Sequence, residues 1–274
     1  MKSPSLLSVK NLNVTISNST ILKKISFELQ KNEILGVVGE SGSGKSITAF
    51  SIINLFSSKK LQQKGEIFFN GYRIDSMSEK EFEKIRGSQI SMIFQEPMSS
   101  LNPSMKCGNQ VLETILKHKI LKPNKGLLHV LDLFEKVKLK NPKVVFNKYP
   151  HELSGGQQQR VMIAIAISCN PQILIADEPT TSLDGIVKEE IISVLKEIQK
   201  ETKMSIIFVS HDLNLISKFA NNIIVLNKGC IVESGISNKV FNNPQNVYTK
   251  MLLSSRPPKK LSLIHISEPT RRKR

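Results

Sequence analysis

Residues 39–46 read GESGSGKS, a combination of residue types suited to hold a triphosphate. The glycines let consecutive backbone N–H groups point into one concavity, Lys45 can reach the β- and γ-phosphates, and Ser46 can offer a hydroxyl to Mg²⁺. The segment follows a short apolar run, residues 34–38, and precedes a helix-compatible stretch, residues 46–55, which is the setting this pattern requires. The predicted phosphate loop consists of Gly39, Glu40, Ser41, Gly42, Ser43, Gly44, Lys45 and Ser46.

A pair of acids follows a second apolar run, ILIADE at residues 173–178. A buried strand would deliver Asp177 to its carboxyl end, where a carboxylate can hold Mg²⁺, usually through water. Glu178 is then placed to orient or deprotonate a water that attacks the γ-phosphate. The alternative is two exposed acids at a strand end, but Lys45 upstream favours the catalytic interpretation.

Residues 153–160 read LSGGQQQR, in which a serine and two glycines precede a helix expected over residues 157–168. The first N–H groups of such a helix are free and can bind an anion. A chain with one phosphate loop needs a second anion site only if that site serves another chain's nucleotide. The residues expected there are Ser154, Gly155, Gly156 and Gln157.

The composition is that of a globular protein: 274 residues, 39% hydrophobic, 5% aromatic and a formal net charge of +16. No stretch reaches the roughly 18 consecutive apolar residues of a membrane span, and the start has no apolar signal core, so a cytosolic location is expected. The basic charge leaves nucleic acid, an anionic membrane surface or lysine-rich solvated faces open. The cysteines, Cys107, Cys169 and Cys230, are isolated and are expected to be buried, reduced thiols.

The elements expected to position these residues give an α/β fold. Short apolar runs typical of buried parallel strands occur at residues 34–38, 90–94, 173–176, 206–209 and 223–226, with a helical pattern at residues 187–200. Alternating β-formers at residues 6–16 and 21–30, and the Asn70-Gly71 hairpin signal after residues 66–70, predict an N-terminal antiparallel β layer. A helical insertion is expected over about residues 98–151, with helices at 109–119 and 127–137.

The end of the chain has an unusual sequence. Residues 261–271, LSLIHISEPTR, resemble the translation of a common transposase sequencing adapter. We therefore expect residues 256–274 to be a tail of which 261–274 is translated adapter, the alternative being a natural basic tail. The four basic residues and one acidic residue of 261–274 contribute +3, so the remaining body, with its domain at residues 6–255, carries +13.

Five motifs in order resemble the nucleotide-binding subunit of an ATP-binding cassette (ABC) transporter over residues 6–255. They are GESGSGKS, the glutamine of FQEP, LSGGQQQR, ILIADEPTTSLD and the Ser210-His211-Asp212 sequence. The resemblance implies a P-loop NTPase cassette with a RecA-like parallel-sheet core, an N-terminal antiparallel β subdomain and an inserted α-helical subdomain. It also implies ATP and Mg²⁺ as ligands.

The resemblance assigns further roles. Gln95 would sense Mg²⁺ and the attacking water, His211 would contact the γ-phosphate, and Asp184 would belong to the nucleotide site. Two cassettes would close head to tail on two ATP molecules, so that Ser154 and Gly156 contact the γ-phosphate on the partner. The residue aligned with the family's adenine-stacking aromatic is Ile16, which predicts packing of adenine against an aliphatic face.

Within the family, VGESGSGKS, FQEPMSSLNP, YPHELSGGQQQR and the late Asn243-Pro244 and Tyr248-Thr249-Lys250 resemble the dipeptide, oligopeptide and nickel import group. Residues 245–248 read QNVY where that group commonly has proline before the tyrosine. The resemblance implies a bacterial importer in which two ATPase subunits serve two membrane permeases and an extracytoplasmic substrate-binding protein. The subunit would then be peripheral, on the cytoplasmic face of the inner membrane.

Three alternatives remain at this point. Peptide is the first choice of cargo and nickel or a metal chelate the second. A non-transport ABC ATPase that acts on nucleic acid or ribosomes would use the basic charge. A nucleotide-binding module without hydrolysis is opposed by the presence of both Glu178 and His211.

Overall fold

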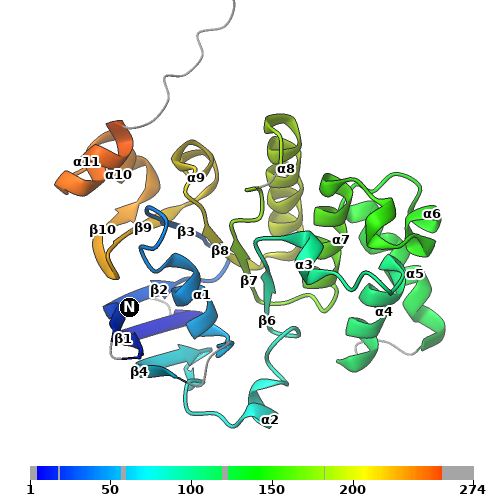
Figure 1. Ribbon diagram of the computed structural model, residues 1–274, viewed down its shortest axis with the longest axis horizontal. Helices are drawn as coiled ribbons and strands as arrows, with labels where there is room; N and C mark the ends of the chain where they lie inside the picture. Colours follow the sequence, from blue (N-terminus) through cyan, green and yellow to red (C-terminus); the bar gives the residue numbers. More distant parts are fainter. Residues whose placement is uncertain (1–4, 18, 57–59, 119–122, 182, 255–274) are drawn as a thin grey trace, which may run out of the picture.

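The computed structural model describes residues 5–17, 19–56, 60–118, 123–181 and 183–254, and the chain folds into two β-sheets with helices packed around them (Figure 1). The expectations for residues 256–274 therefore concern a part of the chain outside this description. Within the described ranges, no helix is both long and apolar enough to span a bilayer.

The smaller sheet is antiparallel, as the alternating N-terminal segments predict. Its strand order is β2-β1-β4-β5, with β1 Leu7–Ile16, β2 Ser19–Leu29, β4 Leu61–Phe69 and β5 Tyr72–Arg73. The pairing of Phe69 with Tyr72 leaves Asn70 and Gly71 as a two-residue turn, and both have positive φ, which confirms the hairpin signal.

The larger sheet has the order β10-β9-β3-β8-β7-β6. The strands are β3 Ile34–Val38, β6 Ile90–Ile93, β7 Ile173–Asp177, β8 Ser205–Val209, β9 Asn222–Asn227 and β10 Cys230–Ile236. All neighbours from β9 to β6 are parallel, as predicted, whereas β10 is an antiparallel edge strand. β10 was not predicted, because its residues are half-buried or exposed and form no continuous apolar run.

The helices of the described residues include the five that were predicted, with shifted ends, and others that no sequence pattern predicted. They are α1 Lys45–Ile52, α2 Glu79–Phe82, α3 Pro97–Ser100, α4 Cys107–Lys117, α5 Pro123–Lys136, α6 Pro142–Asn147, the 3-10 turn η1 Pro150–Glu152, α7 Gly155–Ile167, α8 Gly185–Thr202, α9 Leu213–Phe219, α10 Ser237–Asn242 and α11 Val247–Ser254. The described part of residues 98–151 contains helices and no strand, and these helices lie beside α7 (Figure 1).

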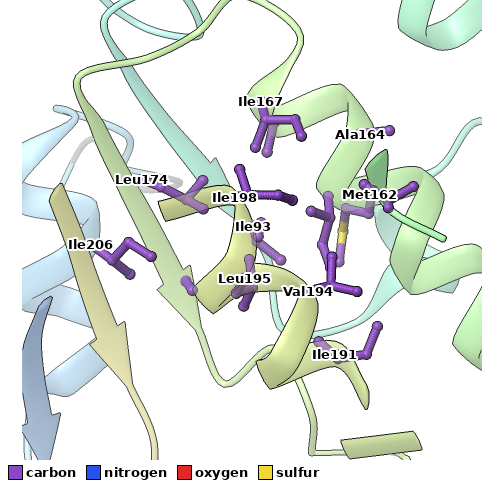
Figure 2. Packing of buried hydrophobic residues seen from close by; sticks show 14 of the residues in the cluster. Ile93, Met162, Ala164, Ile167, Leu174, Ile191, Val194, Leu195, Ile198 and Ile206 are labelled. Carbon is purple, nitrogen blue, oxygen red and sulfur yellow. The ribbon is translucent and has the colours of Figure 1, made fainter. Parts of the chain in front are cut away.

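Two cores cover the two faces of the six-stranded sheet, because alternate residues of each buried strand point to opposite sides. Leu174 of β7 joins the core beneath α7 and α8, whereas Ile175 joins the core shared with α1 and the antiparallel sheet. Figure 2 shows Leu174 beside Leu195 and Ile198 of α8. Burial on both faces explains why these strands read as continuous apolar runs.

Ion pairs connect α7 and the segment directly after α5 to α8. The Arg160 guanidinium, 9% exposed, donates to the carbonyl of Val137 at 2.8 Å and pairs with Glu190 at 2.6 Å. The more exposed Lys138 pairs with Glu197 at 2.6 Å. The helical region is thus attached to the sheet core by one largely buried cation as well as by apolar packing.

The expectation of three buried thiols is wrong for one cysteine. Cys107 and Cys169 are buried, but Cys230 is only half-buried. It stands at the start of β10, whose position at the sheet edge leaves one side uncovered.

Candidate functional site

The phosphate loop connects β3 to α1 and has the backbone that its glycines were expected to allow. Gly44 is the N-cap of α1 with φ +104°, and a Cβ there would lie 2.5 Å from the Leu22 side chain. A Cβ on Gly39 would lie 2.3 Å from the carbonyl oxygen of Leu226. No side chain caps α1, so its first N–H groups remain available to an anion.

Lys45 lies under this loop, and 5% of its side chain is exposed. Its Nζ donates to the carbonyl oxygens of Gly39 and Glu40, each at 2.9 Å. Burial lowers the pKa of Lys45, while Glu178 and Asp177 oppose that change. The ammonium is therefore partly desolvated and close to two carboxylates.

The end of β7 brings Asp177 to the same place. Asp177 is 2% exposed and accepts a hydrogen bond from Ser46 Oγ at 3.1 Å. Burial is the main cause that raises the pKa of the Asp177 carboxyl, and the Ser46 hydroxyl lowers it. A hydroxyl and a carboxylate that already touch fit the hard oxygen ligands that Mg²⁺ prefers.

Glu178 is the centre of a small polar network. Its Oε1 lies 3.8 Å from Lys45 Nζ, and its Oε2 lies 3.0 Å from His211 Nδ1 and accepts from Thr181 Oγ1 at 2.8 Å. The residue has φ +46°, an unusual conformation for a side chain of this size, and its N–H donates to the Val209 carbonyl at 3.0 Å. The local backbone thus aims the carboxylate back toward the phosphate loop.

A cavity of about 810 Å³ lies in front of this network. Its lining includes Lys45 and Ser46 of the loop together with Glu178, His211 and Ile16. The remaining lining residues are Ile21, Glu40, Ser41, Gly42, Gly44, Ile47 and Gln95. Ten of the residues predicted from the sequence therefore share one cavity. Ile21 and Ile47 were missed, because neither belongs to a motif.

One buried hydroxyl of the loop has no hydrogen-bond partner in the described residues. Ser43 is 4% exposed, and its Oγ has no hydrogen-bond partner within the described residues. A buried hydroxyl without a partner is costly unless a ligand or water satisfies it. Ser43 does not line the cavity, however, so its hydroxyl gives no evidence for a ligand there.

The predicted residues 154–157 do not line the cavity. The Ser154 side chain accepts from the Gln157 N–H, and the Gln157 side chain accepts from the Ser154 N–H at 3.0 Å, which forms a capping box. The box starts α7 at Gly155, two residues before the predicted start. Asp184 likewise lies outside the cavity, where its carboxylate caps α8 by accepting from Val187 N–H.

This arrangement of side chains can bind a polyphosphate and activate a water molecule for attack on it. The Lys45 ammonium, the Glu178 carboxylate and the His211 imidazole lie next to one another and all line the cavity. The family model of the ABC transporter matches residues 22–181. This chain belongs to the ABC transporter family. The match includes the phosphate loop, the LSGGQQQR segment, Asp177 at the end of β7 and Glu178 directly after it.

Individual relatives of the cassette are similar over almost its whole length. It is 41% identical to the dipeptide transport ATP-binding protein DppD of Lactococcus lactis over 94% of this chain and 75% of that protein. It is 41% identical to the oligopeptide transport ATP-binding protein OppD of Bacillus subtilis, over 92% of this chain and 72% of that protein.

Solved structures agree with the fold. CbiO1 of Clostridium perfringens, part of the ABC transporter complex CbiONQ, has a TM-score of 0.77 at 29% identity and covers 88% of this chain and 92% of its own. The dimeric cassette MJ0796 bound to ADP and Pi has a TM-score of 0.75 at 27% identity over 84% of this chain and 98% of its own. The cassette is an α/β ATPase with the predicted fold class.

Proposed function

We propose that the cassette is the ATP-hydrolysing subunit of a bacterial peptide importer. The observation that carries this proposal is the 41% identity to dipeptide and oligopeptide transport ATP-binding proteins over more than nine tenths of the chain. The importer would contain a second ATPase subunit, two permeases and an extracytoplasmic substrate-binding protein. The cassette would then sit on the cytoplasmic face of the inner membrane.

In the proposed site, the phosphate loop amides and Lys45 bind the β- and γ-phosphates of ATP. Ser46 and Asp177, which already share a hydrogen bond, would hold Mg²⁺ together with Gln95, which lines the same cavity. The metal would supply charge neutralisation on the phosphate oxygens. Ile16 and the neighbouring Ile21 would form the aliphatic surface for adenine.

Glu178 would orient the attacking water and accept its proton. Support comes from its position, because its carboxylate lies between Lys45 and His211 at the cavity wall. His211 would contact the γ-phosphate while its Nδ1 stays on the Glu178 carboxylate, 3.0 Å away. Thr181 donates to the same oxygen and would limit the orientations of the base.

The residues that stand outside the cavity would act across a dimer. Ser154, Gly155, Gly156 and Gln157 at the start of α7 would meet the nucleotide of a second copy or of a related cassette, and Asp184 would approach the same interface. Residues 98–151 would form the inserted helical subdomain. The dimeric, ADP-bound form described for MJ0796 supports this arrangement.

The test is uptake in the organism that carries the gene. Replacement by Lys45→Ala should abolish uptake of labelled di- and oligopeptides while ⁶³Ni²⁺ uptake stays unchanged. Loss of nickel uptake with normal peptide uptake would contradict peptide as the cargo and favour nickel. A salt-dependent shift of duplex DNA or ribosomal RNA by the purified chain, with peptide uptake normal in the variant, would overturn the transport role.

A further inference from the structure

The C-terminal helix α11 contacts the phosphate loop through one side chain. The hydroxyl of Tyr248, the second residue of α11, accepts a hydrogen bond from the Glu40 N–H at 3.2 Å. The two residues are 208 positions apart in the sequence. Tyr248 lies outside residues 22–181, the range matched by the family model, so the contact adds a residue to the site from a different part of the chain.

The amide that Tyr248 holds belongs to the peptide group that faces Lys45. The N–H of Glu40 and the C=O of Gly39 are the two polar ends of one planar peptide unit. The carbonyl end accepts from Lys45 Nζ at 2.9 Å, and the amide end donates to the Tyr248 hydroxyl. Fixing one end of a planar group fixes the direction of the other.

Hydrogen bonds at the start of α11 hold Tyr248 in place. Its N–H donates to Asn246 Oδ1 at 2.8 Å. Asn246 and the preceding Gln245 are in turn held by Glu233 of β10, whose carboxylate accepts from Gln245 N–H at 2.8 Å and Asn246 N–H at 3.1 Å. Since β10 pairs with β9 and β9 with β3, the strand that ends at the phosphate loop, the start of α11 is anchored to the same sheet as the loop.

We propose that Tyr248 is a positioning residue for ATP binding, whose hydroxyl orients the Gly39–Glu40 peptide so that its carbonyl holds the Lys45 ammonium toward the phosphates. The inference rests on the proposed role of Lys45 in binding ATP. The loop is then preorganised before the nucleotide arrives, and the free energy of ATP binding need not order this peptide. Tyr248 touches no phosphate, so its effect falls on affinity rather than on the chemical step.

The experiment compares Tyr248→Phe with the wild-type full-length chain. This change removes only the hydroxyl. Tyr72→Phe is the matched control, because Tyr72 is 73% exposed on β5. The measurements are the Kd of a fluorescent ATP analogue, the KM and kcat of ATP hydrolysis, and the midpoint of thermal unfolding.

Tyr248→Phe should raise Kd and KM for ATP about three- to tenfold, the effect of losing one neutral hydrogen bond, with kcat within twofold of wild type. Tyr72→Phe should change neither. Unchanged Kd and KM would overturn the inference, and so would a lowered unfolding midpoint with unchanged KM, since that result indicates a purely structural contact. Lys45→Ala separates the two proposals: if it abolishes ATP binding while Tyr248→Phe has no effect, only the role of Tyr248 fails.

Discussion

Replacing Glu178 by glutamine gives two opposite effects that can be worked out from the site. The change keeps the size of the side chain but removes a charge 3.8 Å from Lys45 Nζ. Unit charges about 4 Å apart attract each other by about 1 kcal/mol in water and about 4 kcal/mol at an effective dielectric constant of 20. Only 5% of the Lys45 side chain and 13% of the Glu178 side chain are exposed. Their attraction is therefore nearer to the value of about 4 kcal/mol, before the cost of removing both charges from water is subtracted.

ATP competes with Glu178 for the same ammonium and brings negative charge into the cavity. Glu178→Gln should therefore lower the Kd for ATP, by about 5- to 30-fold if about 1–2 kcal/mol of the interaction survives desolvation. Hydrolysis should fall by about 10²–10⁴, the usual contribution of a general base. Tight binding without turnover should also favour a closed dimer.

The assay pairs fluorescent ATP-analogue binding with phosphate release at saturating Mg²⁺ and ATP, on the purified chain and on the assembled importer. Glu189→Gln is the control, because Glu189 is 79% exposed on α8 and should alter neither quantity. Turnover within threefold of wild type would refute Glu178 as the base. Weaker ATP binding in Glu178→Gln would refute the competition for Lys45.

Three further outcomes test other parts of the structure. Ile16→Tyr should tighten ATP binding about three- to tenfold by adding an aromatic contact to adenine. Unchanged affinity in a competition assay would show that adenine does not bind at this position. Cys230 should react with a thiol reagent in the native protein before either buried cysteine, since burial raises the pKa of Cys107 to about 11; simultaneous labelling of all three would contradict this. Arg160→Met should lower the free energy of unfolding in urea by about 2–3 kcal/mol, whereas Lys138→Met, at an exposed pair, should cost less than about 1 kcal/mol.

The local parts of the site were predictable because each depends on a few consecutive residues. GESGSGKS specifies its own loop, since Gly42 and Gly44 adopt positive φ and Lys45 starts the helix that follows. Asp177 and Glu178 reach a strand end because the short apolar run before them, which is typical of a buried strand, forms β7. Their meeting with Lys45 follows from the rule that ligands bind at the carboxyl ends of parallel strands.

The predictions failed where a single segment carries no distinctive pattern. The edge strand β10 lacks an apolar run, and the exposure of Cys230 follows from its place on that strand. Ile21 enters the cavity only because β2 folds back on β1, and Thr181 reaches Glu178 only because the backbone turns sharply after β7.

The sequence by itself determined which reactive groups the protein carries: the glycine-rich loop with Lys45, the acid Asp177 and the acid Glu178, each encoded in a short motif, for which we propose phosphate, metal and water as ligands. Only the tertiary structure decided which side chains surround them. The strand order β9-β3-β8-β7-β6 places β3 between strands that come 170 or more residues later, and α11 returns to the loop where β3 ends. Such contacts arise from the packing of whole elements, whose free energy is spread over two cores, and no local pattern records them.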